Sequence, residues 1–198
     1  MIKMTMTTQE TQTELDIIIK AKRQLLAKRQ ERTPTPAVIA LAEMRERPAP
    51  ILNVVTDGSR VLLIGRVSLD ETYDPVAAAL RCVRDGADAI AFFTDMRVYS
   101  KGMDDLLLVA RGIPSTSVVC QNYILNEYHV TEARAAGAAA IVAHSTVLDK
   151  AALRQVVSLA HRLKMTSIVQ VSHEEELDYT TALSPHVIGF GDGNSTEF

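Results

Sequence analysis

Six short apolar runs recur along the chain at nearly regular intervals. They cover residues 61–67, 87–93, 116–120, 139–143, 166–171 and 186–190. Runs of this length with hardly a polar position are typical of strands that are buried on both faces of a parallel sheet. The pattern therefore predicts six buried strands.

Amphipathic stretches separate these runs. Within 74–85, Val76, Ala79 and Val83 fall on one helical face, and 148–163 repeats the pattern. Strands that alternate with helices form βα units, whose right-handed crossovers build a parallel sheet covered by helices. Periodicity alone leaves a barrel and an open doubly wound sheet both possible. Since a complete (β/α)8 barrel needs eight strands, six strands would make an incomplete barrel.

The chain before the first strand is predicted to be helical. Polar residues 1–14 predict a flexible tail, and apolar positions from Leu15 onward predict a helix over 15–32. Pro34 and Pro36 end that helix, because proline lacks an N–H donor, and a shorter helix over 37–47 follows. We therefore divide the chain into the tail 1–14, an N-terminal helical extension 15–60 and a barrel part 61–198.

Two short motifs add local detail. Asp57-Gly58 predicts a tight turn, whose flanks stay open between a hairpin and a helix. Residues 172–175, Ser-His-Glu-Glu, predict a capping box that opens the last helix.

Basic residues cluster on the first helix, although the whole chain carries a net charge of −3. Such a cluster is either a solvated helix face or a docking surface for an acidic partner or a phosphate. We take four of its members as candidate interface residues: Lys22, Arg23, Lys28 and Arg29.

Composition excludes several functional classes. The net charge of −3 argues against broad nucleic-acid binding, and two cysteines are too few for a disulfide framework. No apolar stretch reaches the ~18–20 residues of a membrane helix. No two histidines have helical metal-ligand spacing, and no glycine-rich loop joins a strand to a helix, as a nucleotide binder would need. We expect a cytoplasmic protein that has no cofactor or metal, binds no nucleic acid and does not insert into a membrane.

Several motifs in unbroken order resemble indole-3-glycerol phosphate synthase. The most specific is Tyr128-His129-Val130-Thr131-Glu132-Ala133-Arg134-Ala135-Ala136-Gly137, which is similar to that family's "YQVYEARAAGAD". Asp74-Pro75, Thr94-Asp95 and the run 171–177, similar to "VHDEEEL", agree with it. The resemblance implies an α/β fold of the TIM (β/α) barrel type, here incomplete with about six βα units. It also implies an enzyme family that closes an indole ring with loss of carbon dioxide and water.

The same alignment replaces the family's catalytic residues. Arg66 and Ser68 stand where the first strand of the family has Glu and Lys, and Gln121 stands where the third has its Lys, the general acid. Gln170 stands where the fifth strand of the family has a Glu, and Gly191 stands where the sixth strand has an Asn. An amide has no titratable proton near neutral pH, so these positions lose acid–base chemistry. The family's phosphate loops lie on strands seven and eight, beyond the six found here.

These replacements predict a catalytically silent protein that binds another protein, as a scaffold subunit. The alternative is a lyase of the synthase type with a rebuilt active site. A residual polar pocket of Asn122, His144 and Ser172 would lie at the strand ends, where barrel enzymes bind ligands. The open edges of an incomplete barrel, around Leu63 and Ile188, predict a protein partner or a self-dimer that covers them.

Overall fold

The computed structural model describes residues 8–51, 61–67, 74–95 and 101–191. The tight turn predicted at Asp57-Gly58 and the replaced position Ser68 lie outside these ranges. In chain order the elements are α1 (Thr8–Arg32), α2 (Thr35–Glu43), β1 (Ile64–Arg66), α4 (Pro75–Arg84), β2 (Ala89–Phe93), α5 (Gly102–Gly112), β3 (Ser117–Gln121), α6 (Glu127–Ala135), β4 (Ala140–His144), α7 (Lys150–Arg162), β5 (Thr166–Val171), the 3-10 turn η1 (Glu174–Glu176), α8 (Leu177–Ala182) and β6 (Val187–Phe190).

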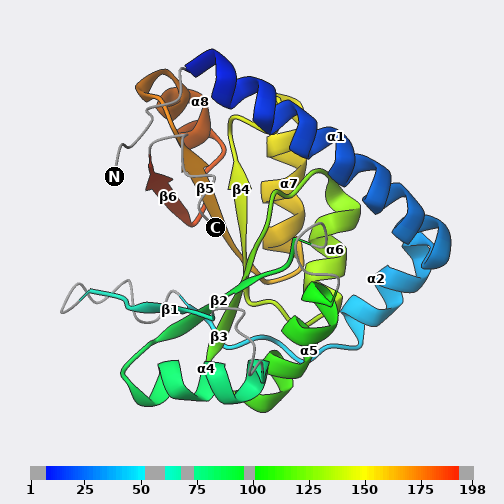
Figure 1. The fold of residues 1–198 in the computed structure, drawn as a ribbon, viewed down its shortest axis with the longest axis vertical. Coiled ribbons are helices and arrows are strands. Elements are labelled where there is room, and N and C mark those ends of the chain that lie inside the picture. Colours follow the sequence, from blue (N-terminus) through cyan, green and yellow to red (C-terminus); the bar gives the residue numbers. More distant parts are fainter. Residues whose placement is uncertain (1–7, 52–60, 68–73, 96–100, 192–198) are drawn as a thin grey trace.

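Six strands form one sheet in the order β1-β2-β3-β4-β5-β6, and every neighbouring pair is parallel. Each strand lies beside the next one in sequence, so the sheet curves as a barrel wall does and is not doubly wound. The prediction of an incomplete (β/α) barrel of six units is confirmed. Figure 1 shows β1 and β6 as the two edges of the sheet.

The two faces of the sheet bury different side chains. Ile90, Phe92 and Val118 face outward into the main core, where β2 packs against α4 and α5 and β3 packs against α5. Ala89, Val119 and Ala140 face the other way and form a smaller cluster on the inner face. Alternation of side chains along each strand produces this division, since successive residues point to opposite faces.

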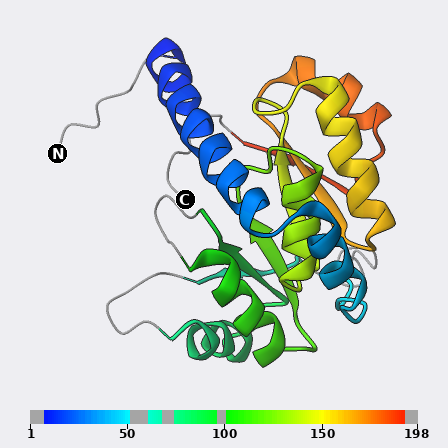
Figure 2. The same cartoon turned by 90° about the vertical axis from the view of Figure 1, so that its right-hand side faces the viewer.

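The N-terminal helices cover one end of the sheet. α1 begins at Thr8, earlier than the predicted start at Leu15, because the Glu and Gln residues of 8–14 favour a helix and acidic residues suit its N-terminus. Figure 2 shows α1 crossing the molecule as a long, straight helix. α2 packs on α6 around Val38 and Tyr128. It starts at Thr35, because Pro36 is tolerated within a first helical turn.

The predicted capping box is shifted by one residue. Glu176, not Glu175, is the carboxylate that turns back, and its Oε2 accepts hydrogen bonds from the backbone N–H groups of Ser172 and His173 at 2.8 and 3.2 Å. The reason is that η1 begins at Glu174, so its third residue is Glu176.

Candidate active site at the carboxyl ends of the strands

Polar side chains gather on the inner face of the sheet where its strands end. The register pairs Arg66 with Ala91 and His144 with Gln170. Every second residue shares a face, so Gln121 lies on the face of Val119, and His144 on the face of Ala140. Strands of a parallel barrel end at the same rim, where barrel enzymes place their chemistry. Three of the replaced family positions therefore lie along this rim, on β1, β3 and β5, and His144 of β4 lies on the strand between Gln121 and Gln170.

His144 is the titratable residue of this rim. Its side chain is buried and its ring lies 4.9 Å from the ring of Tyr123, centroid to centroid. Burial, and after it the positive charge of Lys22, lowers the pKa of His144 to about 4. The imidazole is therefore neutral at physiological pH, in the form that accepts a proton.

Two glutamines flank this histidine along the rim. Within the described part of the chain, the buried Oε1 of Gln121 has no hydrogen-bond partner. Gln170 lies against Gly191, where an added β-carbon would come within 3.1 Å of its Nε2. The small residue at position 191 thus leaves space for the amide at position 170. Arg66 is exposed at the end of β1 and places a positive charge on the same face.

Ser172 belongs to a different group from Asn122 and His144. Ser145 Oγ lies 2.7 Å from Glu176 Oε2 and 3.0 Å from the carbonyl oxygen of Gln170, and Glu176 also binds the N–H of Ser172. Burial alone would raise the pKa of Glu176, but these hydrogen bonds outweigh it and lower that pKa. The group connects the loops after β4 and β5.

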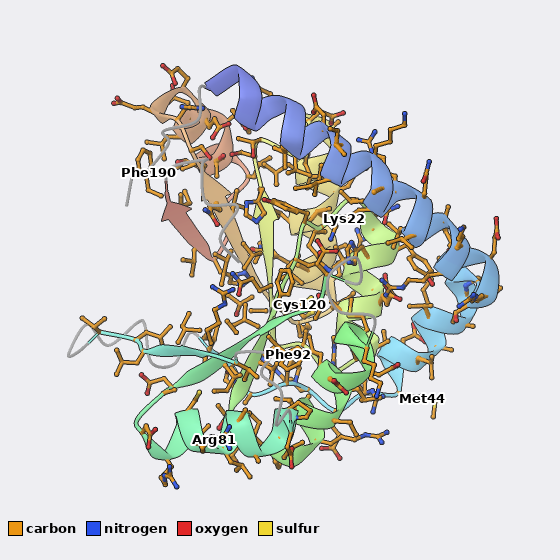
Figure 3. All side chains as sticks on the ribbon, in the orientation of Figure 1. Lys22, Met44, Arg81, Phe92, Cys120 and Phe190 are labelled. Atoms are coloured by element: carbon orange, nitrogen blue, oxygen red, sulfur yellow. The ribbon has the colours of Figure 1, made fainter. Side chains whose placement is uncertain are left out.

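A buried ion pair connects α1 to the ends of β2 and β3. Lys22 Nζ lies 3.3 Å from Asp95 Oδ2 and donates a hydrogen bond to Asn122 Oδ1, and both charged side chains are at most 5% exposed. One N–H group of Asn122 Nδ2 points toward Thr94, whose carbonyl oxygen and Oγ1 lie 3.1 and 2.8 Å from the nitrogen. Figure 3 shows Lys22 reaching from α1 toward the sheet. This network fixes α1 over the strand ends.

His129 and Cys120 complete the same network. His129 Nε2 lies 3.2 Å from Asn122 Nδ2, so this nitrogen accepts and the proton of the neutral ring sits on Nδ1. Burial, followed by the charges of Lys22 and Arg29, lowers the pKa of His129 well below 6.5. Burial raises the pKa of the Cys120 thiol to about 11, which leaves it unreactive at neutral pH.

The four basic residues predicted as one interface point in two directions. Lys22 is buried, and Arg29 pairs with Glu132 where both side chains are 16% exposed. Arg23 and Lys28 are exposed. Lys22 and Arg29 are therefore removed from the candidate interface. Their spacing from Leu15 places them on the apolar stripe of the helix, which was the overlooked signal in the sequence.

Two cavities adjoin the carboxyl ends. One of about 450 Å³ lies between α1 and the residues after β4, with Lys20 and Arg23 on one wall and Thr146 and Val147 on the other. The second, about 20 Å³ beside Asn122 and His129, has room for little more than one water molecule.

The residues that the structure describes contain neither a metal-ligand cluster nor a helix that could cross a membrane. Within the ranges described above, no three His, Cys, Asp or Glu side chains are grouped as metal ligands. None of the helices in those ranges combines the length and the apolar character that a membrane crossing requires.

Comparison with known proteins identifies the relatives of this chain. The family model of indole-3-glycerol phosphate synthase matches residues 15–198. The synthase of Roseiflexus sp. (strain RS-1) is 31% identical over 166 residues, which are 81% of this chain and 60% of that protein. The synthase of Salinibacter ruber is 27% identical over 176 residues, 83% of this chain and 64% of that protein. The synthase of Mycolicibacterium smegmatis is 32% identical over 191 residues, which are 89% of this chain and 67% of that protein. The chain thus spans less than two thirds of the length of the first two relatives.

These comparisons correct the functional prediction. The hypothesis of a non-catalytic scaffold subunit is wrong, because the matching model and these relatives are named as the synthase, an enzyme. The replaced residues at positions 66, 121 and 170 were given too much weight, since the loss of familiar acid–base groups does not exclude other groups on the same rim. The alternative, a lyase with a rebuilt active site, is the one that the relatives favour.

Proposed function

Since the chain belongs to the indole-3-glycerol phosphate synthase family, we propose that it is a carboxy-lyase of that type with a rebuilt active site. The proposed substrate is 1-(2-carboxyphenylamino)-1-deoxyribulose 5-phosphate, which closes to indole-3-glycerol phosphate with loss of carbon dioxide and water. The observation that carries the proposal is the shared rim of Arg66, Gln121, His144 and Gln170 at the carboxyl ends of parallel strands.

The first half of this reaction joins the aromatic ring to the keto carbon. Negative charge then develops on the keto oxygen before that oxygen takes up a proton. The side-chain amide of Gln121 can donate a hydrogen bond to this oxygen, and a fixed donor of this kind commonly contributes about 10²–10³ in rate. The ring carboxylate leaves as carbon dioxide, and its bonding electrons restore the aromatic ring.

The second half removes the new hydroxyl group as water. The carbon between the nitrogen and the hydroxyl-bearing carbon loses a proton to an acceptor, the electrons of that C–H bond form the indole double bond, and the hydroxyl oxygen leaves with a proton from solvent. The imidazole of His144 is available for this role, because its pKa of about 4 keeps the ring neutral at physiological pH, and the same low pKa makes it a weak base. Arg66 would attract the anionic groups of the substrate at the same rim. Lys20 and Arg23, in the cavity of about 450 Å³ next to the end of β4, offer a further binding surface for phosphate.

The experiment is a turnover assay of the purified protein with this substrate, following the fluorescence of the indole product. His144→Gln should lower kcat by about 10²–10⁴, the usual effect of losing one acid–base group. Gln121→Leu should lower it by about 10²–10³. The matched control is His173→Gln, since His173 is exposed and lies outside the rim.

Thermal unfolding of each variant separates loss of chemistry from loss of fold. Product formation by the unmodified protein that is lost in His144→Gln, with an unchanged melting temperature, supports the proposal. Either of two results would refute it: no turnover above the buffer rate by the unmodified protein, or a His144→Gln variant as active as His173→Gln.

A further inference from the structure

A further cavity, of about 390 Å³, lies at the opposite end of the sheet from the proposed active site. Its walls are the segment 44–49 that follows α2, the C-terminal half of α5 with the loop after it, and the first residues of β3. Residues between α6 and β4 close the remaining side. This is the amino-terminal rim of the barrel wall, and neither the proposed reaction nor its site residues involve it.

Four arginines contribute to the lining of this cavity: Arg45, Arg47, Arg111 and Arg134. Glu46 is the single carboxylate among the lining residues. In the described part of the chain, no carboxylate lies within ion-pair distance of Arg45, Arg47 or Arg111. Among the described residues, the cavity is therefore a concave surface where four arginines meet one carboxylate.

Hydrogen bonds hold this surface in place before any ligand arrives. The buried Arg134 donates through Nη2 to the carbonyl oxygens of Arg45 and Glu46, at 3.0 and 2.7 Å. In the opposite direction, Arg45 Nε donates a hydrogen bond of 2.6 Å to the carbonyl oxygen of Ala135. These three bonds tie the segment 44–49 to the end of α6. A prearranged site loses less conformational freedom when a ligand binds.

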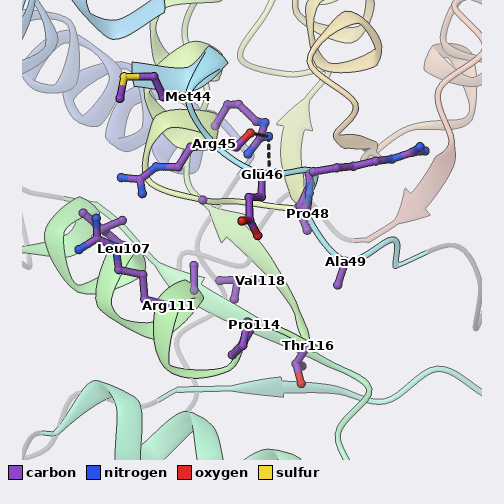
Figure 4. A pocket seen from close by; sticks show the side chains of 15 residues that line it. Met44, Arg45, Glu46, Pro48, Ala49, Leu107, Arg111, Pro114, Thr116 and Val118 are labelled. Carbon is purple, nitrogen blue, oxygen red and sulfur yellow. Dashed lines mark hydrogen bonds between the residues drawn. The ribbon is translucent and has the colours of Figure 1, made fainter. Parts of the chain in front are cut away.

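The remaining wall is apolar. Leu107, Pro114 and Val118 line the cavity beside the arginines, and Figure 4 shows Arg45 and Arg111 reaching the same side of it. Two neighbouring guanidinium groups match the oxygens of a phosphate, and the volume is within the range of small-molecule sites. We propose that this cavity binds a small phosphate monoester whose apolar or aromatic body lies on Leu107 and Val118.

Phenyl phosphate is the probe for this site, because it joins an aromatic ring to a dianionic group. Isothermal titration should give saturable binding that is weaker for inorganic phosphate, which lacks the ring, and for benzoate, which carries one charge. Phenol, which has no charge at neutral pH, should not bind measurably.

Arg111→Gln is the decisive variant, since Arg111 is exposed and its side chain makes no hydrogen bond to any residue of the described ranges that its loss would break. It should weaken phenyl phosphate binding about tenfold or more, as expected for one charge-assisted contact. Arg154→Gln, an exposed arginine of α7 outside the cavity, is the matched control and should bind normally. Glu46→Gln removes the one negative charge of the lining and should tighten binding.

Three outcomes would overturn the inference. One is no saturable binding of phenyl phosphate up to millimolar concentration. Another is equal affinity of the Arg111→Gln and Arg154→Gln variants. The third is binding that survives Arg111→Gln but is lost in Lys20→Gln, which would place the ligand at the carboxyl ends instead. None of these results depends on turnover, so the inference can fail while the proposed reaction stands.

Discussion

The buried pair of Lys22 and Asp95 makes a quantitative test of how α1 is held. Asp95→Asn keeps the size of the side chain but removes its negative charge. The ammonium of Lys22, 5% exposed, would then lose Asp95 as its counter-ion in the interior, while Asn122 Oδ1 still accepts its hydrogen bond. A charge left without its counter-ion in such a place is strongly unfavourable.

The magnitude follows from the burial of both partners. Removing one member of a buried ion pair costs about 3–5 kcal/mol of unfolding free energy. For a chain of this size each kcal/mol lowers the melting temperature by about 2–4 °C, so the variant should melt roughly 6–20 °C below the unmodified protein. Arg84 and Asp85 form an exposed ion pair, with side chains 73% and 69% exposed. Asp85→Asn should therefore lower the free energy of unfolding by only ~0–1 kcal/mol.

Urea unfolding of the two variants, followed by circular dichroism, provides the comparison. A double variant, Lys22→Met with Asp95→Leu, should recover most of the lost stability, because replacing a buried pair by apolar residues is often neutral. Limited proteolysis within α1 should be faster in Asp95→Asn than in the double variant, since the ion pair anchors that helix.

An Asp95→Asn variant that loses less than about 1 kcal/mol of unfolding free energy, or no more than Asp85→Asn loses, would contradict a buried, anchoring ion pair. Either result would mean that water reaches the Lys22 ammonium, and that α1 lies less closely on the strand ends than the structure indicates.

Three further predictions concern pH, the sheet edges and substrate binding. Folding lowers the pKa of His144 to about 4 and that of His129 well below 6.5, so both rings are neutral in the folded protein and take up protons when it unfolds at acidic pH. The free energy of unfolding is therefore fully present above about pH 6.5 and declines as the pH falls toward 4. The His144 contribution amounts to about 3 kcal/mol, and His144→Phe should flatten the urea midpoint between pH 7 and pH 5. Leu63, which directly precedes the edge strand β1, is 54% exposed, and Ile188 in the other edge strand, β6, is 37% exposed. We expect a second copy of the chain to cover these edges, so sedimentation velocity should show a dimer that Leu63→Glu dissociates; a monomer at all concentrations would contradict this. If the proposed reaction occurs, Arg23→Gln should raise KM about tenfold with little change in kcat, because Arg23 lines a cavity and touches no reacting atom; an unchanged KM would remove Arg23 from substrate binding.

Most of the architecture could be read from the local pattern. The apolar run 166–171 coincides with β5, and the amphipathic stretch 74–85 contains α4, whose start is capped by Asp74 through hydrogen bonds to the N–H groups of Val76 and Ala77. Strand periodicity, helix periodicity and proline positions depend on neighbours within a few residues. This is why six strands in sequential order were predictable.

The site was predictable only in part. The rim positions Arg66, Gln121 and Gln170 follow from the alternation of side chains in aligned parallel strands, so their gathering could be expected. The consequence drawn from them was wrong, because the chemistry of a rim depends on which other side chains join it. His144 joins the rim, but position 144 is not among the catalytic positions that the resemblance to the family identified.

The amino-acid sequence by itself determined the order and type of the elements, since these depend on interactions between residues close along the chain. Only the tertiary structure decided which charges lie inside. Lys22 and Arg23 are adjacent residues of one basic helix, yet one is buried and the other exposed. The difference arises because α1 turns one face toward strand ends whose Asn122 lies 100 positions away, and such a contact exists only after the chain has folded.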